Sequence, residues 1–149
     1  MEAVLVELSR EQCLRLMATA PVGRIIYTRQ AMPAVELVNF TIDAGDIVIR
    51  TASSGKLAAA IRGAVVAFEA DEYDAVTRGG WSVTIVGQAR EVTDLGHAER
   101  LRATGPHPLV PGDQPYLVAI TPGIVTGRCL SSAGSGPAGT GGALRAQAL

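Results

Sequence analysis

Neither sign of charge predominates in this 149-residue sequence, which has 13 lysines and arginines, 14 aspartates and glutamates, and a formal net charge of −1. Proteins that bind nucleic acid broadly present a clustered basic face, and a balanced composition argues against that class. The sequence also lacks an apolar run of the roughly 20 residues that a helix needs to cross a bilayer. We therefore expect neither a nucleic acid nor a membrane as a partner.

Cysteine is scarce. The two residues, Cys13 and Cys129, match no metal-ligand spacing and no disulfide framework. The N-terminus carries Glu2 and Glu7 and has no basic start followed by an apolar run, so no signal peptide is predicted. The sequence contains no P-loop, no zinc-site spacing and no Ser/His/Asp arrangement. These absences favour a soluble cytoplasmic protein.

At this length a single domain is the default, and the composition changes sharply only near the end. Residues 131–142 are almost entirely Ser, Gly, Ala, Thr and Pro, which is the composition of a flexible linker. We therefore expect a folded domain over residues 1–130 and a disordered tail over residues 131–149.

One stretch combines the end of a strand, a hydroxyl-rich turn and the start of a helix. The β-branched run Ile47–Ile49 suits a buried strand, and serine is a good N-cap for the apolar run that follows. Seven residues supply two cations and three hydroxyls, namely Arg50, Thr51, Ser53, Ser54 and Lys56. Such a turn offers charged groups and free backbone N–H groups to a phosphate. An ordinary capped helix with solvated cations explains the composition equally well.

The remaining chain indicates short strands and few helices. Ser9 and Gln12 have capping-box spacing and begin one of three expected helices, over residues 10–19, 54–62 and 94–103. His97 on the last of these, like His107 after it, has no partner pattern and is expected at the surface. Strands are expected over residues 23–28, 34–42, 47–51, 64–70, 81–93 and 116–128, the last broken near Pro122 and Gly123. Short turns join the first three strands into an antiparallel meander, and the whole predicts a small, mainly β barrel.

Six short motifs occur in order between residue 9 and about residue 130. They are Gly23-Arg24-Ile25, Val38-Asn39-Phe40, Arg50-Thr51 with Gly55-Lys56, Ala67-Phe68-Glu69-Ala70-Asp71, Gly80-Trp81-Ser82-Val83 with Gly87-Gln88-Ala89-Arg90, and Thr126-Gly127-Arg128. Their order and spacing resemble the pyridoxamine 5′-phosphate oxidase-like flavin-binding split barrels. The resemblance implies a six-stranded antiparallel split β-barrel with two or three short helices, which forms a homodimer and holds FMN at the dimer interface.

The resemblance also implies which residues bind the flavin phosphate. The strand, turn and helix over residues 50–56 would hold it, in agreement with the phosphate reading of this stretch, through Arg50, Thr51, Ser54 and Lys56. Arg24 would add a further cation, and its partner is either a phosphate or Glu36 across the hairpin.

Four further residues are implied near the flavin ring. Val38 and Asn39 lie on a strand that usually faces the ring, and Trp81 and Ser82 begin a strand that lies near it. A buried Trp81 is equally consistent with a core or interface anchor.

A flavin carries the redox chemistry itself, so the lack of an evident acid–base pair does not argue against an oxidoreductase, and no catalytic residue is assigned. The sequence predicts an FMN-dependent oxidoreductase acting on an unidentified small molecule. The alternatives are a flavin-binding, storage or sensor protein without turnover, suggested by departures from the family pattern at Leu37 and Cys129, and a deazaflavin-dependent reductase. True pyridoxamine phosphate oxidase activity is not expected, because only Arg128 and Arg145 offer basic groups near the C-terminus.

Overall fold

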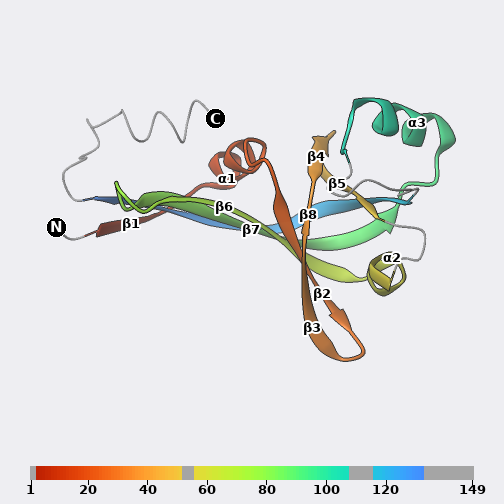
Figure 1. Ribbon diagram of the computed structural model, residues 1–149, viewed down its shortest axis with the longest axis horizontal. Helices are drawn as coiled ribbons and strands as arrows, with labels where there is room; N and C mark the ends of the chain where they lie inside the picture. Colours follow the sequence, from red (N-terminus) through yellow and green to blue (C-terminus); the bar gives the residue numbers. More distant parts are fainter. Residues whose placement is uncertain (1–2, 52–55, 108–115, 133–149) are drawn as a thin grey trace. The chain divides into compact units, whose positions relative to one another are not determined.

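The computed structural model describes residues 3–51, 56–107 and 116–132 (Figure 1). Most of the expected tail, residues 133–149, lies outside this part of the chain. The described residues form eight strands and three helices. In chain order these are β1 (Ala3–Glu7), α1 (Arg10–Met17), β2 (Gly23–Arg29), β3 (Met32–Val38), β4 (Phe40–Asp43), β5 (Asp46–Thr51), α2 (Lys56–Ile61), β6 (Val65–Asp74), β7 (Gly79–Glu91), α3 (Leu95–Thr104) and β8 (Tyr116–Ser132).

The strands pair in the order β3-β2-β6-β7-β8-β5-β4, and β1 pairs with β8. The pairings β1–β8, β2–β3, β4–β5 and β5–β8 are antiparallel. This confirms the predicted mainly β, antiparallel fold with three short helices. The predicted number of six strands is wrong, because β1 was not expected and the strand expected over residues 34–42 is two strands.

The break between β3 and β4 also overturns the expected three-stranded meander. Val38 ends β3 opposite Gly23 of β2, and Phe40 begins β4 opposite Ile49 of β5. Asn39 between them belongs to neither strand. The chain therefore leaves one hairpin at Asn39 and enters another, and β3 and β4 stand at opposite ends of the sheet order.

Two other strands run further than expected. β6 continues through the acidic residues to Asp74, whose carboxylate accepts hydrogen bonds from the backbone N–H groups of Val76 and Thr77 in the following turn. β8 continues through Pro122 and Gly123 and ends at Ser132, two residues into the expected tail.

The chain divides into two compact units, and β6, β7 and β8 contribute residues to both. The first unit comprises residues 1–20, 69–84 and 125–149. In it, α1 begins at Ser9 with both hydrogen bonds of the predicted capping box, 3.2 Å and 2.8 Å long. Cys13 of α1 is fully buried, and a Cβ placed on Gly127 of β8 would lie 2.6 Å from its sulfur. Helix α1 therefore packs closely on β8 within this unit.

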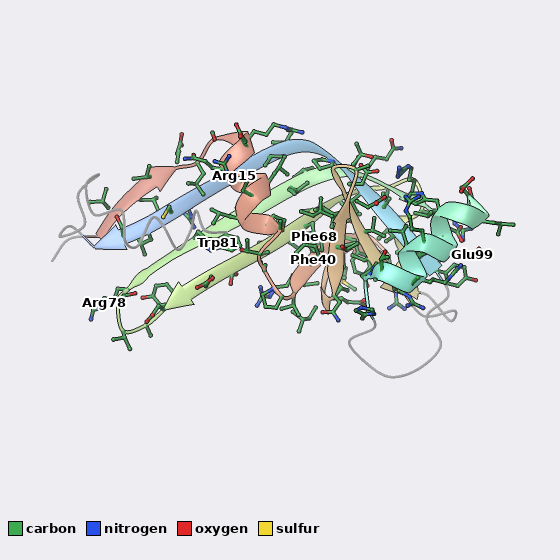
Figure 2. The ribbon with its side chains drawn as sticks, turned by 90° about the horizontal axis from the view of Figure 1, so that it is seen from above. Arg15, Phe40, Phe68, Arg78, Trp81 and Glu99 are labelled. Atoms are coloured by element: carbon green, nitrogen blue, oxygen red, sulfur yellow. The ribbon has the colours of Figure 1, made fainter. Side chains whose placement is uncertain are left out.

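The second unit comprises residues 21–68 and 85–124. One part of its core lies between α3 and the β5–β8 pair, and comprises Val48, Ala98, Leu101, Leu117 and Ala119. Another part contains Phe40 and Phe68, whose rings meet edge to face with centroids 4.9 Å apart (Figure 2). The burial of alternate residues along β7 runs without interruption through Gly87.

None of the helices in the described residues is long and apolar enough to cross a membrane.

Candidate functional site

Thr51 is the best-defined member of the predicted phosphate site. It is the last residue of β5, whose buried run Ile47–Ile49 the sequence indicated. Only 5% of Thr51 is exposed, and its hydroxyl oxygen is buried without a hydrogen-bond partner in the described part of the chain. Buried hydroxyls normally have a partner, because an unpaired one costs stability. The hydroxyl group of Thr51 can therefore form a hydrogen bond with a ligand.

Arg50 precedes Thr51 but points to the other face of the strand, because successive side chains of a strand alternate. Its antiparallel partner is Leu117, which belongs to the core beneath α3, whereas Thr51 pairs with Tyr116. The two residues that the sequence grouped are therefore divided between two faces. The remaining predicted phosphate ligands are not tested, because Ser54 and the side chain of Lys56 lie outside the described part.

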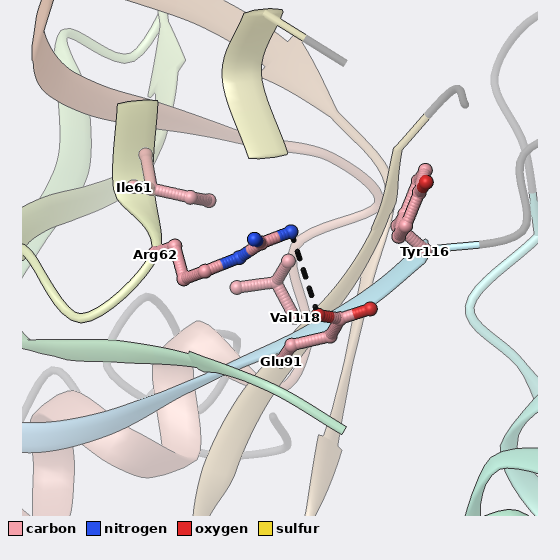
Figure 3. Close-up of a pocket in the computed structure, with 5 residues that line it drawn as sticks. All are labelled: Ile61, Arg62, Glu91, Tyr116 and Val118. Atoms are coloured by element: carbon pink, nitrogen blue, oxygen red, sulfur yellow. Dashed lines mark ion pairs between the residues drawn. The ribbon is translucent and has the colours of Figure 1, made fainter. Parts of the chain in front are cut away.

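A pocket lies on the Thr51 face of the second unit. Thr51 and Tyr116 are direct partners in the β5–β8 ladder, so their side chains lie on the same side of the sheet. Tyr116 lines the pocket together with Ile61, Arg62, Glu91 and Val118 (Figure 3). Arg62 follows the end of α2 and forms an ion pair of 3.7 Å with Glu91, the last residue of β7. These residues come from three separate elements and form no sequence motif, so sequence reasoning missed them.

The predicted residues Arg24 and Val38 lie on the β2–β3 hairpin. Arg24 is opposite Leu37, and Val38 is buried opposite Gly23. Glu36, one proposed partner of Arg24, accepts a hydrogen bond of 3.0 Å from the Tyr27 hydroxyl. Burial raises the pKa of Tyr27, and this hydrogen bond and the negative charge of Glu36 raise it further.

Asn39, which was predicted to face the flavin ring, forms a hydrogen bond within the chain. Its side-chain amide donates a hydrogen bond of 2.8 Å to the backbone carbonyl of His107, which follows α3. Asn39 thus holds the chain after α3 at the point where β3 gives way to β4.

Trp81 and Ser82 belong to the first compact unit, whereas Thr51 and the pocket belong to the second. Trp81 is 6% exposed, and its indole nitrogen is buried without a hydrogen-bond partner among the described residues. Ser82 is half-buried. Trp81 therefore combines core burial with an available hydrogen-bond donor.

His97 is not the solitary surface residue that the sequence suggested. Its Nε2 atom lies 2.7 Å from the carboxylate of Asp43, and Arg100 lies 3.8 Å from the same carboxylate. The backbone N–H of His97 donates to the carboxylate of Asp94, which caps α3. The cluster attaches α3 to Asp43, the last residue of β4, a contact between distant residues that no local pattern reveals.

These features can bind a polar ligand without themselves supplying catalytic machinery. The described residues contain no group of His, Cys, Asp or Glu side chains that could hold a metal ion. The second unit offers the unpartnered hydroxyl of Thr51. Near it are the ring of its ladder partner Tyr116 and, around the same pocket, the guanidinium of Arg62 and the carboxylate of Glu91.

A sequence model of the pyridoxamine 5′-phosphate oxidase family matches residues 9–129. An uncharacterized protein of Mycobacterium tuberculosis is 41% identical over 127 residues, which cover 82% of this chain and 83% of that protein.

Two solved structures resemble the chain closely in fold. One is an FAD-binding protein of Mycobacterium smegmatis, with 28% identity, a TM-score of 0.67 and coverage of 85% of this chain and 98% of that one. The other is a Corynebacterium glutamicum protein of the pyridoxamine 5′-phosphate oxidase type, with 27% identity, a TM-score of 0.74 and coverage of 88% and 97%.

Proposed function

The chain belongs to the pyridoxamine 5′-phosphate oxidase family of split barrels, and on that premise we propose that it binds a flavin through the flavin's phosphate and acts as an oxidoreductase. The proposed cofactor is FMN or the FMN half of a larger flavin. The name of the Mycobacterium smegmatis relative, an FAD-binding protein, supports a flavin of either size. The substrate is a small molecule.

The unpartnered hydroxyl of Thr51 is the observation that carries this proposal. A phosphate oxygen next to it would accept the hydrogen bond that no described residue accepts. Thr51 also stands at the strand end where the family resemblance places the phosphate. Ser54 and Lys56 remain proposed ligands from that resemblance. Arg50 is likewise proposed from that resemblance alone, because its side chain lies on the other face of β5.

A bound flavin supplies hydride and single-electron transfer, whereas the protein supplies binding, orientation and hydrogen bonds. In this chain Thr51 would fix the phosphate end. Val38 and Asn39, which belong to the same compact unit as Thr51, are proposed contacts of the ring. Trp81 and Ser82 remain contacts that the family resemblance implies.

We also propose that the chain is a homodimer. On β3, the apolar side chains of Val35 and Leu37 are 60% and 53% exposed and share one face of the hairpin. Their partners across the hairpin are Ile26 and Arg24. An exposed apolar strand face of this kind suits burial against a second copy.

Absorbance spectra of the purified protein with and without added FMN or FAD test flavin binding. We expect a perturbed flavin band that is lost when Arg50 and Lys56 are both replaced by Gln. The matched control is Arg15→Gln, because Arg15 is an exposed helical residue whose ion pair of 2.7 Å is with Glu11, one turn before it in α1. A wild type that perturbs neither spectrum would refute the cofactor assignment, and a deazaflavin would then be tested.

Anaerobic addition of NADPH to the flavin-loaded protein separates an oxidoreductase from a storage or sensor protein. Bleaching of the flavin band, followed by recovery with an oxidant, is expected of the oxidoreductase. A stable oxidised band under these conditions would favour the protein without turnover.

Light scattering during size-exclusion chromatography tests the homodimer. Wild type should elute with twice the mass of the chain, and Leu37→Lys should shift it toward the monomer. A wild type that stays monomeric with flavin bound would contradict this proposal.

A further inference from the structure

Helix α3 is attached to β4 through a contact that includes a histidine. The Nε2 atom of His97 lies 2.7 Å from one carboxylate oxygen of Asp43, and the guanidinium of Arg100 lies 3.8 Å from the other. The side chains of Asp43 and His97 are only 26% and 28% exposed. Figure 1 shows α3 beside the ends of β4 and β5. All three residues belong to the second compact unit, so the contact is complete within it.

The apolar part of this attachment is small. The buried side chains of α3 are Ala98 and Leu101, and they pack with Val48, Leu117 and Ala119 of β5 and β8. Alanine has a single methyl group to bury, so most of the apolar contact of the helix comes from one leucine. The polar contact with Asp43 is therefore a substantial share of what holds α3 on the sheet.

The charges around His97 balance only when its ring is protonated. Asp43 contacts the ring, and the carboxylate of Asp94 accepts a hydrogen bond of 2.7 Å from the backbone N–H of His97. Arg100 supplies one positive charge. Two negative charges therefore face one positive charge while the imidazole is neutral, and a protonated imidazole supplies the second.

The neighbouring charged groups do not alter this balance. Asp46 of β5 is the ladder partner of Asp43, but it forms its own ion pair of 2.8 Å with Arg90 of β7. Glu99 lies two residues beyond His97 on α3, and side chains at that spacing do not face each other on a helix. The group whose charge changes near neutral pH is thus the imidazole itself, because histidine ordinarily changes its charge between pH 5 and pH 8.

We propose that His97 is a pH-sensitive latch of α3. A neutral ring offers the Asp43 carboxylate an uncharged donor, whereas a protonated ring adds the attraction between two opposite charges. The first turns of α3 are therefore held on β4 most firmly at the acidic end of this range, and the helix opens more often as the pH rises and the ring loses its proton. The latch involves no flavin, so it stands or fails independently of the proposed function.

Amide hydrogen exchange of the α3 backbone at about pH 5 and about pH 8 measures this opening. Protection factors, corrected for the pH dependence of exchange in an unfolded chain, give the opening constant at each pH. In wild type we expect the opening constant of residues 95–104 to rise about two- to fivefold between the two pH values, which is the strength of a partly exposed ion pair.

Three variants assign the response to its residues. His97→Gln and Asp43→Asn should each abolish the rise, because either change removes one of the two charges of the ion pair. Arg100→Gln should increase opening at both pH values and preserve the rise, because a guanidinium stays charged throughout this range. Urea unfolding at both pH values confirms that each variant is folded.

His107 provides the matched control. It is the other histidine of the sequence, it is exposed, and its backbone carbonyl rather than its ring accepts the hydrogen bond from Asn39. His107→Gln removes a titrating imidazole just beyond α3 and should keep the full response of wild type.

Three results would overturn the proposal. They are a wild type whose α3 opens equally at the two pH values, a rise that persists in His97→Gln or Asp43→Asn, and a rise that disappears in His107→Gln. If His97→Gln does not fold, Asp43→Asn still decides the question, because it keeps the shape of the side chain and removes only its charge.

Discussion

Replacing Thr51 with Val should make the flavin-free protein more stable. The Thr51 hydroxyl is buried with no partner in the described residues, and an unpaired buried polar group costs about 1–3 kcal/mol. Valine has nearly the same shape, suits a strand and has no polar atom to leave unpaired. For a chain of this size each 1 kcal/mol raises the melting temperature by about 2–4 °C. We therefore expect the melting temperature to rise by several degrees.

The same change should weaken flavin binding. A hydrogen bond to a charged group contributes about 1.5–3 kcal/mol, so losing it should lower affinity at least tenfold. At a flavin concentration of 100 times the wild-type Kd, flavin stabilises wild type by about 2.7 kcal/mol, and a tenfold weaker variant by only about 1.4 kcal/mol. Thermal unfolding with and without flavin measures both effects in one assay.

Two controls isolate the hydroxyl. Thr51→Ser keeps it and should retain flavin affinity while losing about 1 kcal/mol of stability with the buried methyl group. Thr28→Val changes an exposed strand threonine and should alter stability by less than about 0.5 kcal/mol. If Thr51→Val destabilises the flavin-free protein, the hydroxyl has a partner in the folded chain. If it leaves affinity unchanged, Thr51 is not a ligand. Either result refutes the reasoning.

Three further predictions concern the fold. A Cβ at Gly87 would overlap the carbonyl oxygen of Thr121 in the β8 backbone, so Gly87→Ala should cost about 1–3 kcal/mol or more in urea unfolding; a neutral effect would contradict the close approach of the two strands. The raised pKa of Tyr27 favours its neutral form in the folded state, so its contribution is complete below the ordinary tyrosine pKa of about 10 and is lost as pH rises through the higher folded value. The stability of wild type relative to Tyr27→Phe should therefore be constant well below pH 10 and fall as the pH rises above about 10, and a difference that stays constant there would contradict the raised pKa of Tyr27. Cys13 is fully buried, and burial raises the pKa of its thiol, so a disulfide reagent should label it only after unfolding; rapid labelling of the native protein would contradict the packing of α1.

The sequence predicted those helices and strands that contacts between neighbouring residues determine. The helix at residues 10–17 was recognised from Ser9 and Gln12 because a capping box is a contact between neighbours, and both of its hydrogen bonds are present. The strand ending at Thr51 was evident because its residues are β-branched and buried. By contrast, β1 was missed because its partner is the far end of β8 and its residues Val4, Leu5 and Val6 are all exposed. A strand without a buried face shows no alternation of polar and apolar residues.

The candidate residues of the phosphate site and of the pocket divide in the same way. Thr51 was found because it lies in a contiguous stretch with recognisable chemistry. Arg62, Glu91 and Tyr116 were missed because only the tertiary fold brings them together, and no spacing in the sequence encodes their meeting. The separation of Arg50 from Thr51 follows from the strand assignment itself, since adjacent residues of a strand face opposite ways.

The pairing of β5 with β8 decides on which face of the sheet the Thr51 hydroxyl and the Tyr116 ring lie. A slip of one residue in that ladder would move every side chain of β8 to the other face, which would exchange Tyr116 for Leu117 opposite the buried hydroxyl. Two features oppose such a slip. Leu117 and Ala119 are buried beneath α3 and could not face the pocket without exposing the core. Further along β8, Gly123 lies so near the carbonyl of Val86 that a Cβ there would be 3.0 Å from it, so the approach of β7 to β8 also depends on the register. The core and the glycines thus fix the face of β5 and β8 on which the Thr51 hydroxyl and the pocket lie, although none of these residues lines the pocket.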